Sequence, residues 1–148
     1  MSRAAVLDLL RNDTELAALG TSTGWPALVI VPNFEADQLP GNGAFIVVCW
    51  RHTDFEEAVQ ENAERHIEIY FHVPVALSTD FGRIDNMIDR VDAIFAAVAD
   101  SPAGVVGGDG YRLNYIGFEG RGPDVTDPGY KTICRQAAYM ALSCKVIA

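Results

Sequence analysis

The chain has 148 residues, a length that fits one domain able to bury a substantial hydrophobic core. Apolar residues make up 49% of it and charged residues 21%, which excludes an intrinsically disordered chain. The net charge of −9 argues against a nucleic-acid-binding protein, because such proteins need a basic surface. No apolar run approaches the roughly 18 residues of a membrane span, and no secretory signal is predicted at the N-terminus.

The N-terminal third predicts two short helices and a strand. The apolar spacing favours helices over about 2–11 and 15–19, with Asn12-Asp13 placed to cap the second one. Gly20 is expected to end the second helix in the left-handed conformation. Residues 27–31 are apolar and partly β-branched, which is typical of a short strand.

The middle of the chain predicts an antiparallel pair of strands. Residues 44–52 are apolar at both odd and even positions, as in a strand covered on both faces. Residues 64–73 alternate, so four side chains are expected to face the core: Ile67, Ile69, Phe71 and Val73. The intervening positions are expected to face outward: Glu64, His66, Glu68, Tyr70 and His72. The acidic segment 53–63 predicts a long loop between the two strands.

The remainder predicts a long helix followed by two strands. Ser78-Thr79-Asp80 can cap a helix in which apolar residues recur every three or four positions to about Ala99. Residues 111–119 and 130–147 predict strands on either side of a loop rich in glycine, proline and aspartate. In the last strand the even-numbered residues are expected to face inward. Its odd-numbered residues, expected to face outward, include Lys131, Arg135, Tyr139 and Lys145.

These elements predict a single α+β domain over residues 1–148. We expect a mostly antiparallel sheet of about five strands. One long amphipathic helix is expected to pack across the sheet, with a further helix at the N-terminus.

The titratable residues do not form a recognisable catalytic, metal or cofactor site. His66 and His72 lie on one strand at a separation of about 20 Å, so they cannot share a metal. The three cysteines, Cys49, Cys134 and Cys144, are odd in number and widely spaced, and we interpret them as small buried hydrophobic residues. No common hydrolase, zinc-protease or phosphate-loop motif occurs. The sequence therefore predicts no enzyme, no cofactor and no metal.

One side of the predicted long helix carries Asp85, Asp89 and Asp92. Like charges at this spacing slightly destabilise a helix. We interpret them as a solvated face, because general acid–base catalysis would need burial that nothing in the pattern indicates.

Two segments of opposite charge favour a role in assembly. The connection after residue 53 carries five acidic residues and no basic one: Asp54, Glu56, Glu57, Glu61 and Glu64. The last strand carries Lys131, Arg135 and Lys145 without an acidic residue. The acidic connection of one subunit could dock on the basic strand of the next, and head-to-tail contacts of this kind close into a ring when the rotation allows. The alternative is two unrelated solvated surfaces.

The order of these elements resembles the tail terminator proteins of long-tailed, siphovirus-type bacteriophages, particularly those of actinobacterial phages. The resemblance spans nearly the whole chain and has no catalytic motif. It rests on the order and hydrophobicity of the segments 6–20, Val31-Pro-Asn-Phe34, 45–50, 66–73, 79–85, 111–118 and Gly129-Tyr130.

The resemblance implies a structural protein of the virion, at the junction of tail and neck, that assembles in the host cytoplasm. Six copies would form a ring that caps the head-proximal end of the tail tube and ends its polymerisation. The implied partners are further copies of the chain, the major tail tube protein, the head completion or connector protein, and genomic DNA that passes through the lumen without specific binding. No membrane is involved.

An acidic lumen would repel DNA phosphates, and the acidic connection or Glu68 could line it. Two alternatives stay open at this point. One is another head–tail joining protein of the neck, and the other is a small α+β enzyme or ligand-binding domain.

Overall fold

The computed structural model describes residues 3–34, 39–56 and 59–146, with the backbone alone at 52–56 and 59–63. The helices are α1 (Arg3–Arg11), α2 (Thr14–Leu19) and α3 (Phe81–Ala96), and α3 continues into the 3₁₀ turn η2 (Ala97–Asp100). The strands are β1 (Val29–Val31), β2 (Phe45–Glu56), β3 (Val59–Pro74), β4 (Val105–Val106), β5 (Tyr111–Arg121), β6 (Val125–Asp127) and β7 (Thr132–Lys145).

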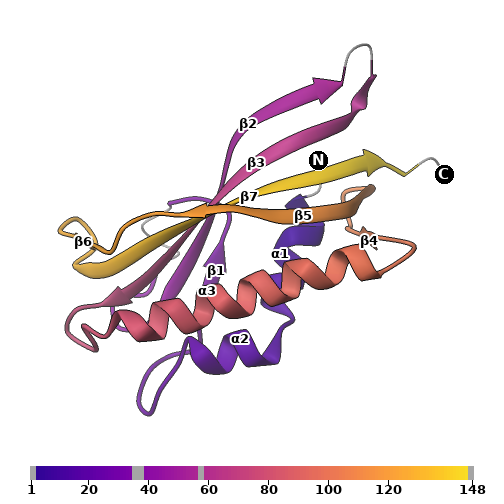
Figure 1. The fold of residues 1–148 in the computed structure, drawn as a ribbon. Coiled ribbons are helices and arrows are strands. Elements are labelled where there is room, and N and C mark those ends of the chain that lie inside the picture. The colour runs from indigo at the N-terminus through magenta and orange to yellow at the C-terminus, as the bar shows by residue number, and fades with distance from the viewer. Residues whose placement is uncertain (1–2, 35–38, 57–58, 147–148) are drawn as a thin grey trace.

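All the described strands belong to one curled, mixed sheet in the order β1-β2-β3-β7-β5-β4, with β6 beside β7 (Figure 1). The expectation of about five mostly antiparallel strands under one long helix is therefore wrong. Within the described residues the sheet has seven strands, and β1 runs parallel to β2, with Val29 opposite Phe45. The helical part is divided among shorter helices. Three of the strands have only two or three residues, too short for a periodic pattern to reveal.

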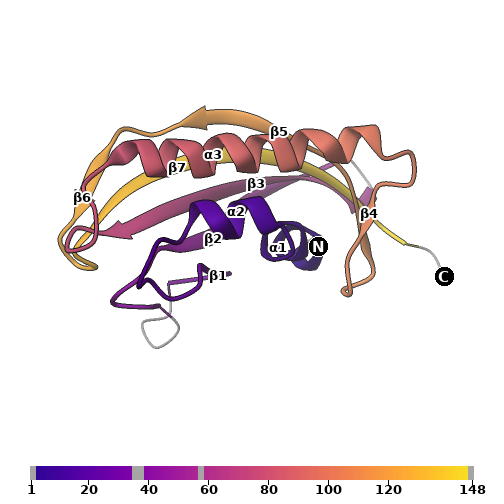
Figure 2. The same cartoon turned by 90° about the horizontal axis from the view of Figure 1, so that it is seen from below.

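The helices lie on one face of the sheet, where α3 runs along the strands and α1 and α2 lie beside it (Figure 2). The Asp80 carboxylate caps α3 by accepting a hydrogen bond from the Gly82 N–H at 2.9 Å. The apolar positions of α3 are buried against the sheet: Ile84, Met87, Ile88, Val91, Ile94 and Phe95. Each such side chain contributes roughly 1.5–3 kcal/mol on full burial. None of the described helices is long and apolar enough to span a membrane.

The two N-terminal helices are joined by a capping residue that the sequence pattern indicates. Asp13 accepts a hydrogen bond from the Leu16 N–H at 2.8 Å and so caps α2. Its carboxylate also binds Arg90 of α3 at 2.7 Å. The expected left-handed ending at Gly20 is wrong, because its φ is −84°. A side chain there would collide with Leu28, which is the reason for a glycine.

The acidic segment 53–63 is not the predicted long loop. The backbones of β2 and β3 remain paired through Asp54 opposite Glu64 to Glu56 opposite Val59. This outer part of the two strands extends away from the helices (Figure 1), and we call it, from the pair Asp54–Glu64 outward, the arm. Tertiary pairing here overrides the low strand propensity of glutamate and aspartate.

The predicted faces of β3 and β7 have different outcomes. Ile67, Ile69, Phe71 and Val73 of β3 face the helices and are at most 1% exposed, which confirms the prediction. In β7 the prediction is wrong. Ile133, Ala137 and Tyr139 of β7 stand opposite Val73, Ile69 and Ile67 of β3, so the odd-numbered side chains face the helical core, which Ala141 also joins.

The other face of the sheet carries a smaller hydrophobic cluster at one end. Val31, Phe45 and Val47 form its buried centre. Phe34 packs there against His72 with ring centroids 5.9 Å apart. No helix covers this face within the described part of the chain (Figure 2), and we call it the open face.

Candidate functional site

The acidic side of α3 is partly solvated, as the sequence suggested, since the Asp89 and Asp85 side chains are 66% and 43% exposed, but it is also bound to the sheet. Arg121 of β5 binds both Asp89 and Asp92 at 2.7 Å. Arg135 of β7 binds Asp85, also at 2.7 Å. The hydroxyl of Tyr139 donates a hydrogen bond to Asp92. Burial is the larger cause, and this hydrogen bond the second, of a raised pKa of Tyr139. The three aspartates, Asp85, Asp89 and Asp92, therefore fix the position of α3 relative to β5 and β7.

Arg135 consequently differs from the two lysines with which the sequence analysis grouped it. Its Nε donates a hydrogen bond to the Gly122 carbonyl at 2.9 Å in addition to the Asp85 ion pair. Lys131 and Lys145 are exposed. Of these three cations, the structure places Arg135 inside the subunit and leaves the lysines available at the surface.

We expect Arg135→Glu to lower the free energy of unfolding by about 1–3 kcal/mol. The new carboxylate would face Asp85 and Asp124, and the Gly122 carbonyl would lose its donor. Lys131→Glu is the matched control, with the same change in charge and an expected effect within about 0.5 kcal/mol on the unfolding free energy of the monomer. Urea denaturation of both variants measures the difference, and equal stabilities would contradict the internal role of Arg135.

Lys131 and Lys145 do not form one basic surface. They stand at opposite ends of β7, about 46 Å apart along the strand at roughly 3.3 Å per residue. Lys145 pairs with Tyr111 near the base of the arm, whereas Lys131 adjoins the turn after β3. A single acidic segment of a neighbouring subunit could therefore reach only one of them.

The acidic residues of the arm are only partly described. Glu64 is exposed at its base. Glu57 lies outside the described residues, as do the side chains of Asp54, Glu56 and Glu61.

Glu68, the residue expected to line a lumen, lies half-buried on the open face. It binds Arg51 at 3.1 Å and accepts a hydrogen bond from the Tyr70 hydroxyl at 2.6 Å. Burial and this bond raise the pKa of Tyr70, which stays a neutral donor. The Arg51 guanidinium offsets the charge of Glu68, so this carboxylate alone does not make the face acidic.

His72 and Cys134 form a buried pair that the sequence did not predict, since His72 was expected to face outward. The His72 Nδ1 lies 2.7 Å from the Thr132 hydroxyl and its Nε2 lies 3.5 Å from the Cys134 sulfur. Burial lowers the pKa of His72 to about 4 and raises that of Cys134 to about 12. At neutral pH the pair is a thiol beside a neutral imidazole, whereas a nucleophilic cysteine needs a thiolate.

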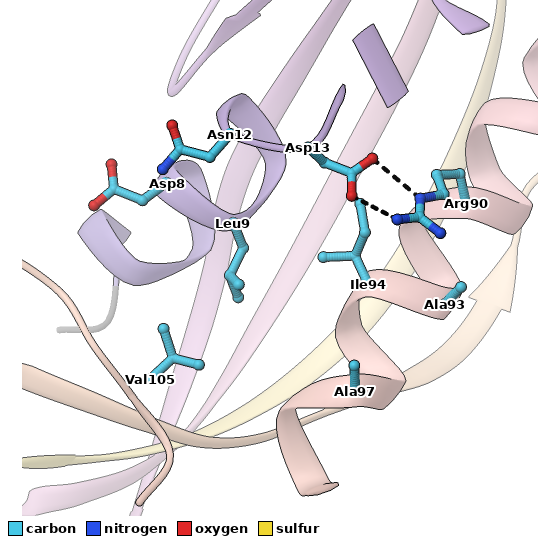
Figure 3. Close-up of a pocket in the computed structure, with 9 residues that line it drawn as sticks. All are labelled: Asp8, Leu9, Asn12, Asp13, Arg90, Ala93, Ile94, Ala97 and Val105. Carbon is cyan, nitrogen blue, oxygen red and sulfur yellow. Dashed lines mark hydrogen bonds and ion pairs between the residues drawn. The ribbon is translucent and has the colours of Figure 1, made fainter. Parts of the chain in front are cut away.

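A groove separates α1 from the second half of α3 (Figure 3). Its volume is about 450 Å³. Leu9, Ala93, Ile94, Ala97 and Val105 make it mainly apolar. Asp8 and Asn12 stand on its α1 side, and the Asp13–Arg90 ion pair closes one end. The sequence pattern could not indicate this groove, because its walls come from three elements far apart in the chain.

Comparison with known proteins identifies a shared fold. No protein-family model matches the sequence, and no curated protein is significantly similar to it. One solved structure, 14% identical, aligns over 95% of this chain and 96% of its own length with a TM-score of 0.51. Another, 19% identical, aligns over 95% of this chain and 92% of its own length with a TM-score of 0.60. That structure is of the virion of a native gene transfer agent particle, and this chain has the fold of one of its proteins.

Proposed function

We propose that this protein is a structural component of a virion and acts as a tail terminator. Copies of the chain, six by the family resemblance, form a ring at the head-proximal end of the tail tube. The ring ends tube polymerisation and offers a docking surface to the head completion or connector protein. The observation that carries the proposal is the fold, shared over almost the full length of a chain from a gene transfer agent virion.

The edges of the sheet support ring formation. Within the described residues, β1 pairs only with Phe45–Val47 of β2, and β4 pairs only with Arg112 and Leu113 of β5. Much of the outer edge of both long strands is therefore unpaired in the subunit. Unpaired edges favour strand addition from another chain. Two unlike edges give a heterologous contact, which is the kind that builds rings.

The arm and Glu68 are our proposed candidates for the lumen. The acidic residues of this segment of the sequence, Asp54, Glu56, Glu57, Glu61 and Glu64, would give a lumen negative charge that repels DNA phosphates during passage. A two-stranded ribbon is marginally stable alone, so the arm also needs a neighbouring surface to pack against.

The proposal is tested by mixing the purified protein with polymerising tail tube subunits and measuring tube length by electron microscopy. We expect shorter tubes with added density at one end, and a native mass near six subunits either in solution or on the tube. The Glu64→Lys variant tests the lumen hypothesis, with unchanged ring mass and slower DNA ejection expected. Tubes of unchanged length, with binding to the connector instead, would assign the protein to another neck position.

A further inference from the structure

An exposed apolar knob with a positive charge stands at one end of the subunit. Val75 and Leu77, in the turn between β3 and α3, are 38% and 36% exposed. Lys131 lies directly beside them, because its carbonyl accepts a hydrogen bond from the Val75 N–H at 3.0 Å. We call these three residues the knob.

The backbone holds the knob in a defined shape. The Pro74 carbonyl accepts hydrogen bonds from the Leu77 and Ser78 N–H groups at 2.9 and 3.1 Å. Lys131 has a φ of 53°, the left-handed region, which costs a residue with a side chain roughly 1–2 kcal/mol. A glycine would be the favoured residue for this conformation alone. The ordered turn lowers the entropy cost of binding through these side chains.

The groove between α1 and α3 has the complementary character. Leu9, Ile94 and Val105 supply apolar walls, and the exposed Asp8 supplies a negative charge on the rim. Within the described part of the chain no cation pairs with the Asp8 carboxylate. The groove thus offers an apolar floor and one available anion, where the knob offers two apolar side chains and one available cation.

The knob cannot enter the groove of its own chain. The knob precedes the start of α3 at Phe81, whereas the residues of α3 and η2 that line the groove run from Arg90 to Ala97. They lie about 14–24 Å from Phe81 at 1.5 Å per residue, and a rigid helix fixes that separation. A contact between the two surfaces must therefore join different copies, and it is a head-to-tail contact.

We propose that the knob of one copy seats in the α1–α3 groove of the next copy, with Lys131 beside Asp8. This inference rests on the proposed ring and names one of its subunit contacts. It adds side-chain specificity to pairing between strand edges, which by itself selects neither the partner nor the register.

The test is the assembly midpoint of the full chain, measured by native mass spectrometry over a concentration series. We expect Lys131→Glu and Asp8→Lys each to raise that midpoint at least tenfold, and the double variant to restore it to near the wild-type value. Lys145→Glu with Asp8→Lys is the matched control and should show no restoration. Lys131→Gly should raise the thermal unfolding midpoint of the monomer, because glycine favours this φ, and should weaken assembly, because it removes the cation. Opposite effects on stability and assembly would show that the loss of assembly does not come from misfolding.

A second pair of variants tests the groove. Ala93 and Ala96 are both exposed on α3, but only Ala93 lines the groove. Ala93→Trp should weaken assembly at least tenfold and Ala96→Trp should not. If the wild type assembles while no charge swap restores Lys131→Glu, or if both tryptophan variants assemble normally, the knob contact is overturned and the terminator proposal stands. A wild type that neither assembles nor shortens tubes overturns the terminator proposal itself.

Discussion

Acidification from pH 7 to pH 4 is expected to remove roughly 3 kcal/mol of unfolding free energy at His72. This side chain is 1% exposed, stacked on Phe45 and enclosed by Phe34 and Tyr130. Burial lowers its pKa from 6.5 to about 4, with Asp127 opposing the shift. Because the folded state binds the proton less readily than the unfolded state, this stability is complete above pH 6.5. It is lost as the pH falls toward 4.

Urea denaturation at pH 7, 5.5 and 4 measures this loss. His72→Gln keeps a polar partner for Thr132 but does not titrate, so it should show a decline about 3 kcal/mol smaller than the wild type. His66→Gln is the control, because His66 is half-buried and lies 2.8 Å from the Glu119 carboxylate, away from His72, so its replacement should leave the decline at His72 intact. Identical pH profiles for His72→Gln and the wild type would contradict a buried neutral imidazole.

Tyr139→Ala is expected to cost about 3–5 kcal/mol, a large part of the stability of a small domain. The ring is 1% exposed and packs edge-on against Phe95 of α3 with centroids 4.9 Å apart. The variant also removes the hydroxyl that Asp92 accepts from. Met140→Ala, one residue along β7 on the open face, should cost roughly 1 kcal/mol because that side chain is half-buried.

Chemical denaturation of the two alanine variants decides the register of β7. The alternation seen in the sequence predicted the reverse order of effects, with Met140 inside and Tyr139 outside. Tyr139→Phe separates the ring from its hydroxyl and should cost roughly 1–1.5 kcal/mol. A larger loss for Met140→Ala than for Tyr139→Ala would restore the original assignment and contradict the pairing of Ile67 with Tyr139.

Sequence periodicity predicted the buried faces only where the two faces differ strongly. In β3 and α3 apolar and charged residues alternate or recur with a clear period, and their inward positions were correct. In β7 the pairs Ala137-Ala138 and Tyr139-Met140 give almost no contrast. Both faces of that central strand are at least half-covered, so the pattern does not reveal which alternate side chains face the helices. Strand β6 was missed because its three residues lie in a segment rich in glycine and proline.

The candidate surfaces depended on contacts that no linear pattern contains. The sequence placed Arg135 beside Lys131 as an outward cation and left Asp85 as a solvated carboxylate. Only the crossing of α3 over β7 joins these two charges within one subunit. The groove likewise needs α1, α3 and β4 together. The exposed Lys131 and Glu64 agree with the outward positions predicted for them, whereas their partners were not predictable.

Asp13 makes two structural contacts, since its carboxylate caps α2 and also binds Arg90 of α3. The Arg90 hydrogen bond is the main reason that its pKa is lowered. Opening of the N-terminal helices therefore breaks a helix cap and an ion pair in the same event. The two N-terminal helices are thus part of the cooperative unit that contains α3, and partial unfolding should release them together with the closed end of the groove.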